Sequence, residues 1–203
     1  MNKITKFITR YKNARRLGLP YFRTSSFNLP EAININGNFI NLEFPDEKGI
    51  FIDFLSIFLD DDYGLTEFRK NRISTIVDIG ANVGFFSLAS RLFFPDSKIH
   101  AYEPNLDLKN YLAHNFSQLN IGLYPQAVGY KNGSVKLDLM GDSNQTRVNE
   151  SSSGTTKMVS LDSVVKEIGG KIDLLKMDCE GSEWDILENP GSLRNVDNVT
   201  LEY

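Results

Sequence analysis

The pattern of hydrophobic and polar positions changes near residue 74. Beyond that point short apolar runs alternate with amphipathic stretches, which predicts an α/β fold with a parallel sheet and crossover helices. Strands are expected at 75–79, 98–102, 122–125, 172–177 and 198–203. Helices are expected at 83–93, 106–118, 161–168 and 183–188, with Ser160 as the N-cap of the third.

A polar stretch interrupts this alternation. Extended segments at 134–140 and 156–160 flank a loop at 141–154 that contains serines at 151–153. We expect this loop to be the mobile element of the chain.

The first 72 residues show other patterns. Residues 4, 7, 8, 11 and 14 are apolar or aromatic at helical spacing, which predicts an amphipathic helix. A hairpin is expected at 32–44 around Asn36-Gly37, and a short apolar helix at 50–59 that ends at three aspartates. We therefore expect an N-terminal extension at 1–72 and one larger domain at 73–203.

The net charge of −4 hides an asymmetry. Residues 1–23 carry seven basic residues and no acid, so the remainder holds 15 basic against 26 acidic residues, a net −11. One interpretation is a basic arm that touches an anionic membrane surface or a polyanionic glycan. The other is a terminal helix docked on the acidic body. The acidic body argues against a nucleic-acid partner.

Composition bounds the class of protein. The 203 residues are 41% apolar and 24% charged, as in a soluble single domain. Cys179 is the one cysteine, so the chain has no internal disulfide and suits a reducing compartment. No apolar run reaches the roughly 20 residues of a membrane span, and no secretory signal is visible. We expect a cytoplasmic protein.

A glycine turn at 80–84 is the strongest chemical signal. Gly80-Ala81-Asn82-Val83-Gly84 follows the first strand and opens a helix, and Glu103 stands at the tip of the second strand. Glycines let the backbone approach a ligand closely, and an acid at that strand tip can accept hydrogen bonds from both ribose hydroxyls. This arrangement predicts a nucleoside cofactor.

Two cofactor classes use such a turn. A dinucleotide needs Gly-x-Gly-x-x-Gly, and here Asn82 replaces the central glycine, where a side chain hinders a pyrophosphate. S-adenosylmethionine suits the turn better. Gly80 and Ala81 would then contact the methionine part, Asp78 and Asn82 would orient the turn or the ammonium, and Glu103 would hold the ribose.

A cluster of acids lies at the tip of the fourth predicted strand. Asp178, Glu180 and Glu183 fall within six residues, and Asp178 is expected beside the strand that carries Asp78. Glu202, near the tip of the last strand, would be the neighbour on the other side. One of these acids can serve as the base that deprotonates a hydroxyl, or Asp178 and Glu202 can bind a divalent metal. We predict no metal. The alternative for Glu183 is a helix-dipole role.

Other reactive residues are weaker candidates. His100 and His114 are expected in packing or surface roles, and Cys179 in a structural one, since nearby acids blunt a thiol. Trp184 is expected either in the core or in the wall of an acceptor pocket.

These residues together resemble the FkbM family of S-adenosylmethionine-dependent methyltransferases. The matching blocks are VDIGANVGFFS at 77–87, AYEPN at 101–105, Ala127-Val128 followed by Asn132-Gly133, VSLDS at 159–163 and LLKMDCEGSEW at 174–184. The resemblance implies a Rossmann-like class I methyltransferase fold. It also implies O-methylation of hydroxyls on sugars, glycans or polyketide-type natural products.

The resemblance also implies site residues. On the methionine side these are Asp78, Gly80, Ala81, Asn82, Gly84 and Phe85; at the ribose Glu103, Pro104 and Asn105; at the adenine Ala127 and Val128. Asp178 and Glu180 would face the acceptor. The chain stops inside the fifth strand, where such a sheet normally continues. We expect either that residues are missing at this edge of the sheet, or that the hairpin or another subunit of a homo-oligomer completes it.

Two other functions stay open. A nicotinamide-dependent oxidoreductase would use the same turn, although Asn82 and the acids count against it. A non-catalytic methyltransferase-like module is compatible with the early end of the chain. The Asn/Asp-Pro-Pro-Tyr/Phe signature of many N-methyltransferases is absent.

Overall fold

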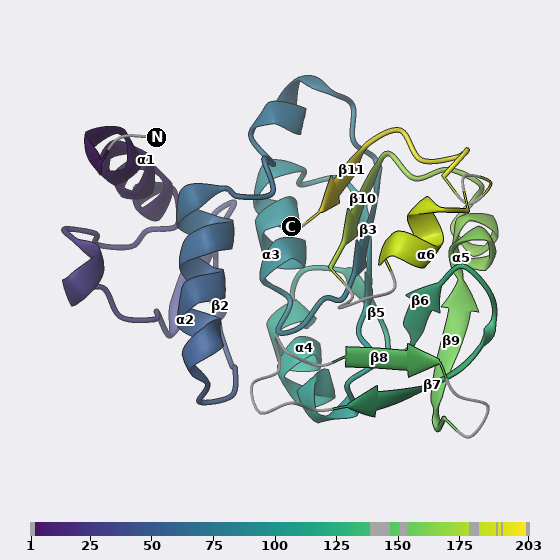
Figure 1. The fold of residues 1–203 in the computed structure, drawn as a ribbon. Helices are drawn as coiled ribbons and strands as arrows, with labels where there is room; N and C mark the ends of the chain where they lie inside the picture. The colour runs from purple at the N-terminus through teal and green to yellow at the C-terminus, as the bar shows by residue number, and fades with distance from the viewer. Residues whose placement is uncertain are drawn as a thin grey trace.

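A parallel sheet forms the centre of the structure (Figure 1). The computed structural model describes residues 3–138, 147–150, 154–178, 183–189, 191 and 193–201. Within them the strand order is β11-β10-β3-β4-β5, and each neighbouring pair is parallel. The strands are β3 (Thr75–Ile79), β4 (Lys98–Tyr102), β5 (Ile121–Tyr124), β10 (Leu174–Met177) and β11 (Val199–Leu201). The predicted α/β architecture is confirmed.

The chain order reverses between β3 and β10. From β3 the chain runs outward through β4 to β5, and it returns on the other side of β3 as β10 and β11. Ligands of open α/β sheets bind beyond the carboxyl ends of the strands at such a reversal. The carboxyl ends of β3, β4 and β10 carry the glycine turn, Glu103 and Asp178, respectively.

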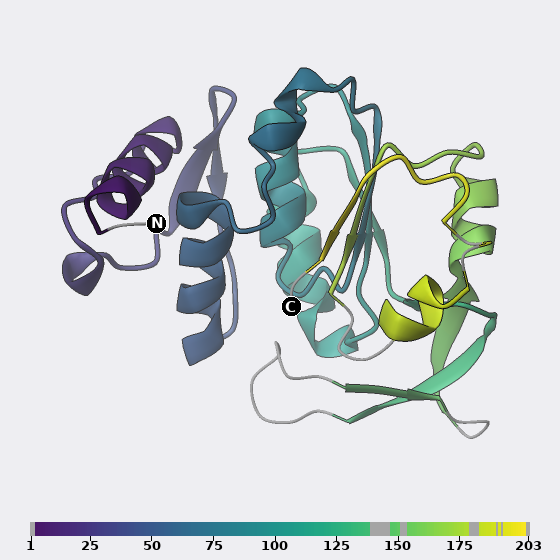
Figure 2. The same ribbon diagram turned by 45° about the horizontal axis from the view of Figure 1, so that its top comes forward.

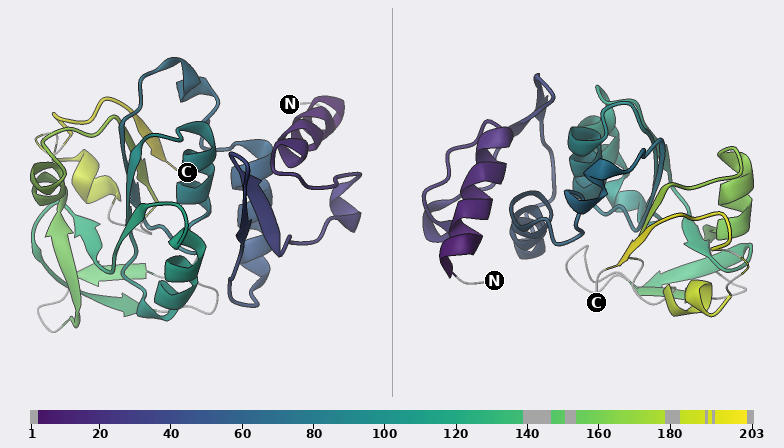
Figure 3. Two further views of the ribbon diagram at one scale, coloured as in Figure 1. Left: turned by 180° about the vertical axis from the view of Figure 1, so that it is seen from behind. Right: turned by 90° about the horizontal axis from the view of Figure 1, so that it is seen from above.

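Helices cover both faces of the central sheet (Figures 1 and 3). One face carries α3 (Phe85–Phe93) and α4 (Lys109–Phe116), with a 3₁₀ turn, η4 (Leu106–Leu108), before α4. The other face carries α5 (Leu161–Glu167) and α6 (Glu183–Leu187). The predicted cap of α5 is confirmed, since Ser160 Oγ accepts a hydrogen bond from the Ser163 N–H at 3.1 Å.

A second sheet lies past the carboxyl ends of the central strands (Figure 2). Its order is β6-β9-β7-β8, formed by β6 (Ala127–Gly129), β9 (Thr156–Ser160), β7 (Gly133–Asp138) and β8 (Arg147–Glu150). The expectation of one loop at 141–154 is wrong in part, because β8 lies inside it and pairs antiparallel with β7. Residues 141–146 and 151–153 lie outside the described ranges.

The N-terminal elements are α1 (Lys3–Arg16), the hairpin of β1 (Ala32–Ile35) and β2 (Asn38–Asn41), α2 (Lys48–Phe54) and the π-helical segment η2 (Leu55–Asp60). They confirm the predicted basic helix, hairpin and apolar helix. The hairpin turns through Asn36 and Gly37, at φ 52° and 93°. It forms its own sheet, so the idea that it completes the central sheet is wrong. Figure 3 shows α2 between α1 and α3.

The hydrophobic core has two main parts, on the two faces of the central sheet. Ile76 and Leu174 belong to the part under α3 and the N-terminal elements, which also contains Leu17 and Phe54. Val77 and Leu175 belong to the part under α5 and α6. Successive strand residues alternate between the two because side chains of a strand point to opposite faces. The N-terminal elements therefore pack directly on α3, and a domain boundary at residue 72 stays a prediction.

Candidate functional site

The turn after β3 contains three left-handed backbone conformations. Gly80, Asn82 and Gly84 have φ of 74°, 48° and 90°. Glycine and asparagine are the residues that enter this region most readily. The N–H groups of Gly80 and Ala81 both donate to the carbonyl oxygen of Tyr102, at 3.0 Å each. The turn is thereby fastened to the end of β4.

Gly84 has a packing role. A Cβ atom at this position would lie 2.5 Å from Cε1 of Phe116 on α4. The absent side chain lets α3 begin against α4, and the left-handed backbone of Gly84 explains why α3 starts at Phe85 and not at 83.

Glu103 joins the tips of β3 and β4. Its Oε2 accepts a hydrogen bond from the Asn82 N–H, and its Oε1 accepts one from the Asn105 N–H, both at 2.8 Å. Burial raises the pKa of Glu103 to about 7, although the two N–H bonds oppose the rise. Each carboxylate oxygen keeps a further lone pair for a ligand hydroxyl. The geometry fits the predicted ribose contact.

Asn105 and Pro104 follow Glu103 on the same strand tip, and both are buried. Asn105 Oδ1 accepts a hydrogen bond from the Asp107 N–H at 3.0 Å and so caps η4. Its side chain thus supports the loop, while its N–H orients Glu103.

A buried lysine links the two strand tips at the chain reversal. Lys176 Nζ lies 3.2 Å from Asp78 Oδ1 and 3.5 Å from Asp178 Oδ2, and it donates to the Gly80 carbonyl oxygen at 2.5 Å. The other oxygen of Asp78 accepts a hydrogen bond from Ser87 Oγ at 2.7 Å. Asp78 is fully buried, which supports the interpretation that it orients the turn.

Lys176 is charged despite its burial. Burial alone lowers the pKa of Lys176, but Asp78 and Asp178 outweigh it, and the net pKa lies above the ordinary value for lysine. A cation placed between two carboxylates compensates charges that would otherwise be costly to bury. The sequence interpretation missed Lys176. The available signal was a lone cation inside the apolar run Leu174-Leu175-Lys176-Met177.

Tyr63 brings the N-terminal part of the chain to the same edge. Its hydroxyl donates a hydrogen bond to Asp178 Oδ2 at 3.0 Å, and its carbonyl oxygen accepts one from Thr200 Oγ1 at 3.0 Å. Asp178 is the member of the group that meets solvent, with 28% of its side chain exposed against none for Asp78. Tyr63 and Lys176 therefore hold this partly exposed carboxylate through the same oxygen, Oδ2.

The structure also places the other expected site residues. Phe85 lies in an aromatic cluster with its ring centroid 5.5 Å from that of Phe54, so its side chain faces the core and not the turn. Ala81 is buried, and Ala127 and Val128 are buried in β6, in two different parts of the core. Glu180 and Glu202, like Cys179, lie outside the described residues.

Three further residues have defined surroundings. Trp184 is 71% exposed, so the core, one of the two positions considered for it, is wrong, and the wall of an acceptor pocket stays a prediction. His100 Nδ1 lies 3.1 Å from the Tyr124 hydroxyl, and His114 Nδ1 lies 3.4 Å from Glu43 Oε1. Over the described part of the chain, no three His, Cys, Asp or Glu side chains converge as a metal site.

Comparisons with known proteins point to one family. The family described as "Methyltransferase FkbM domain" matches residues 78–203, which is more than half of the chain. "Methyltransferase 1" of Beauveria bassiana (strain ARSEF 2860) is 27% identical over 208 residues, covering 86% of this chain and 82% of that protein.

Two solved structures are similar at a lower level. One is a putative RNA methyltransferase from Pyrococcus horikoshii (13% identity, TM-score 0.39, 70% of this chain and 59% of that one). The other is a putative caffeoyl-CoA O-methyltransferase from Staphylococcus aureus (12% identity, TM-score 0.37, 65% of this chain and 53% of that one). The chain spans less than two thirds of either structure, and neither likeness bears on the acceptor. By the match at residues 78–203, this chain belongs to the FkbM methyltransferase family.

Proposed function

We propose that this protein transfers a methyl group from S-adenosylmethionine to a hydroxyl of a saccharide, a glycan or a small natural product. Membership of the family supports methyl transfer. The observation that carries the choice of a hydroxyl is Asp178, a partly exposed carboxylate held by Lys176 and Tyr63 one strand from the glycine turn.

The tips of β3 and β4 would bind the cofactor. Glu103 has lone pairs for the two ribose hydroxyls, and the turn at Gly80, Ala81 and Asn82 would hold the methionine part. The N–H groups of Gly80 and Ala81 already donate to Tyr102, and their carbonyl oxygens accept hydrogen bonds from Lys176 Nζ and the Gly84 N–H, respectively. A contact with the ammonium would therefore use the second lone pair of these carbonyl oxygens. Ala127 and Val128 stay the proposed adenine contacts. The carboxylates at this edge complement the net positive charge of S-adenosylmethionine.

Asp178 would act as the base. When bound, S-adenosylmethionine supplies an electrophilic methyl on a sulfonium. The acceptor oxygen would form the new C–O bond as the C–S bond breaks, sulfur would keep the electron pair, and the hydroxyl proton would pass to Asp178. Lys176 and Tyr63 would hold the carboxylate in place during this step. Glu180 and Glu202 stay proposed as its acidic neighbours.

The same geometry counts against a dinucleotide cofactor. In a dinucleotide site, N–H groups of the turn bind the pyrophosphate. Here the Asn82 N–H is occupied by the Glu103 carboxylate, which also places an acid beside the turn. A pyrophosphate would meet both a missing donor and a like charge, so a nicotinamide-dependent oxidoreductase is disfavoured.

Turnover with labelled S-adenosylmethionine and a panel of saccharides and phenolic or polyketide-type alcohols tests the proposal. We expect methyl ether products, and we expect Asp178→Asn to abolish turnover while cofactor affinity stays within about twofold, because Asp178 contacts the acceptor side. Asp46→Asn, an exposed acid in a loop, is the matched control and should keep full turnover. Cofactor binding without turnover on any alcohol would favour the non-catalytic module.

A further inference from the structure

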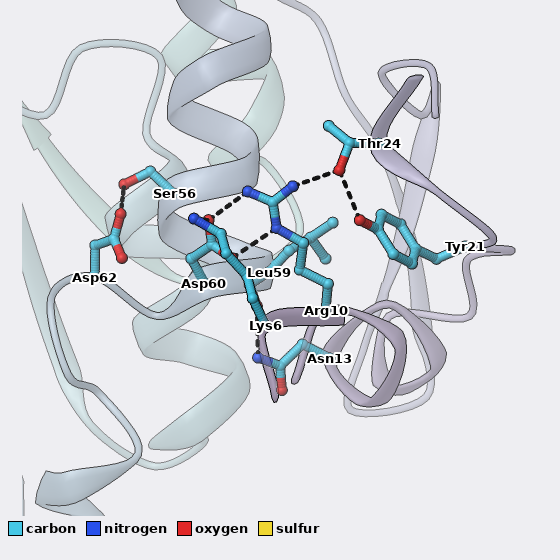
Figure 4. A network of polar contacts seen from close by, with 9 residues as sticks. All are labelled: Lys6, Arg10, Asn13, Tyr21, Thr24, Ser56, Leu59, Asp60 and Asp62. Carbon is cyan, nitrogen blue, oxygen red and sulfur yellow. Dashed lines mark hydrogen bonds and ion pairs between the residues drawn. The ribbon is translucent and has the colours of Figure 1, made fainter. Parts of the chain in front are cut away.

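Helix α1 docks on the body of the protein through a polar edge (Figure 4). Arg10 Nε and Nη2 donate to the two carboxylate oxygens of Asp60 at 2.7 and 2.6 Å, and Lys6 Nζ lies 3.1 Å from Asp60 Oδ2. Asn13 Nδ2 donates to the Leu59 carbonyl oxygen at 3.0 Å, and Arg10 Nη1 donates to Thr24 Oγ1 at 2.6 Å. These contacts fix which face of α1 points inward.

The apolar stripe of α1 is therefore largely exposed, with one edge at the body of the protein, where the Phe7 and Tyr21 ring centroids lie 6.1 Å apart. It consists of Ile4, Phe7, Ile8 and Tyr11, which repeat at helical spacing and are 72%, 44%, 45% and 41% exposed. Within α1, Ala14 is the buried residue. A surface helix of a soluble protein normally does the reverse and buries its apolar stripe. Helix α1 itself lies on the far side of α2 from the central sheet (Figure 3).

Cations flank this stripe. Lys3, Lys12 and Arg15 are exposed on α1, and the whole segment 1–23 has no acid. At 100° per residue Lys3 and Lys12 fall on the two sides of the stripe and Arg15 falls within it. An apolar face bordered by Lys and Arg is the pattern of helices that lie in a membrane interface.

The charge of the rest of the chain favours one orientation of the molecule at a charged surface. The seven cations of residues 1–23 face a remainder with a net charge of −11. An anionic surface attracts residues 1–23 and repels the acidic remainder of the chain. Such a surface would therefore orient the molecule with α1 toward the surface. A polyanionic glycan would pair with the cations but would leave the apolar stripe in water. An anionic bilayer would pair with the cations and would also cover the apolar stripe.

We propose that α1 is a peripheral membrane anchor that lies in the headgroup region of an anionic bilayer. Ile4, Phe7, Ile8 and Tyr11 reach the acyl boundary, and Lys3, Lys12 and Arg15 contact lipid phosphates. No helix in the described ranges is long and apolar enough to cross a bilayer. The Arg10–Asp60 pair holds the enzyme body at the surface with the central sheet facing away from the lipid.

Co-sedimentation of the full chain with vesicles tests this anchor. We expect binding to phosphatidylcholine vesicles that contain phosphatidylglycerol, weak binding to pure phosphatidylcholine, and loss of binding at high salt. Ile4→Gln should weaken the partition by about tenfold through lost apolar burial. Lys12→Gln and Arg15→Gln should each weaken it by about fivefold.

Matched controls distinguish specific anchoring by α1 from nonspecific adsorption to vesicles. Leu106→Gln removes an aliphatic side chain elsewhere that is 63% exposed against 72% for Ile4, and Lys166→Gln removes an exposed cation of α5. Both should bind vesicles as the native chain does. Equal effects of Ile4→Gln and Leu106→Gln would overturn the proposal. So would a lack of vesicle binding combined with retention on a heparin column, or a dimer in solution that Ile4→Gln dissociates. Thermal melting of each variant checks that it is folded.

Discussion

Lys176 Nζ lies 3.2 Å from Asp78 Oδ1, and both side chains are buried at the carboxyl edge of neighbouring parallel strands. The same ammonium donates to the Gly80 carbonyl oxygen and lies 3.5 Å from Asp178. One cation thus connects the glycine turn, where we propose that the cofactor binds, with the carboxylate that we propose faces the acceptor. The relative position of these two parts of the site depends on it.

Lys176→Met should destabilise the fold by about 3–5 kcal/mol, because it leaves the Asp78 carboxylate buried without its cation. Urea denaturation measures this loss as a shift of the midpoint at an unchanged slope. Asp78→Asn in the Lys176→Met background removes the uncompensated charge. We expect the double variant to be more stable than Lys176→Met alone. A double variant that is less stable by the sum of two independent losses would contradict a direct Lys176–Asp78 interaction.

Tyr63→Phe should lower turnover with little effect on cofactor affinity. The change removes one hydrogen bond to Asp178, worth about 1.5–3 kcal/mol to a charged acceptor, and keeps the ring against Phe86. We expect kcat to fall by about tenfold, because Asp178 loses a hydrogen-bond donor that holds its carboxylate in place. Steady-state kinetics and calorimetric titration of the cofactor check both parts. An equal loss of cofactor affinity would show that Tyr63 acts on the fold instead.

The affinity for S-adenosylmethionine should rise with pH around neutrality. Burial raises the pKa of Glu103 to about 7, so the carboxylate proposed to accept the ribose hydroxyls is mostly protonated at about pH 6 and mostly ionised at about pH 8. For folding the sign is opposite. A raised pKa contributes stability below the ordinary glutamate pKa, and this contribution is lost as pH rises through about 7. Calorimetric titration across this range tests the binding effect, which Glu103→Gln should remove.

Gly84→Ala should destabilise the fold by about 2 kcal/mol or more. The new Cβ would meet the Phe116 ring at 2.5 Å and would sit on a backbone at φ 90°. Gly37→Ala provides the comparison, because Gly37 has φ 93° and no heavy atom within 4 Å of the added Cβ. It should cost about 1 kcal/mol through backbone strain alone. Thermal unfolding of the pair separates strain from packing, and equal costs would exclude the clash with Phe116.

Local patterns predicted much of this fold. The strands Thr75–Ile79 and Lys98–Tyr102 were bounded correctly, because each is a short run of strand formers between turn residues. The placement of Asp178 beside the Asp78 strand followed from the strand order of an α/β sheet. The second sheet was not predicted as a sheet. It depends on which of β6, β7, β8 and β9 pair with one another, and a local sequence pattern does not report such pairings.

The candidate site was predicted in part, for a similar reason. Glu103 and the turn could be found because their roles follow from short motifs. Tyr63 lies 115 positions before Asp178, and no local pattern reports such a contact. Lys176 was hidden because a lysine in a strand is usually solvent-exposed, whereas here two carboxylates compensate its burial. Phe85 was placed at the cofactor by position in its motif, but aromatic packing turns it into the core.

Calorimetric titration of the native chain with S-adenosylmethionine, repeated with Glu103→Ala, is the most direct test of the central claim. The account predicts one binding site on the native chain, at least a tenfold loss of affinity in Glu103→Ala, and no heat with a nicotinamide dinucleotide. Absence of binding to the native chain, or an affinity that Glu103→Ala leaves unchanged, would contradict a cofactor site at the tips of β3 and β4.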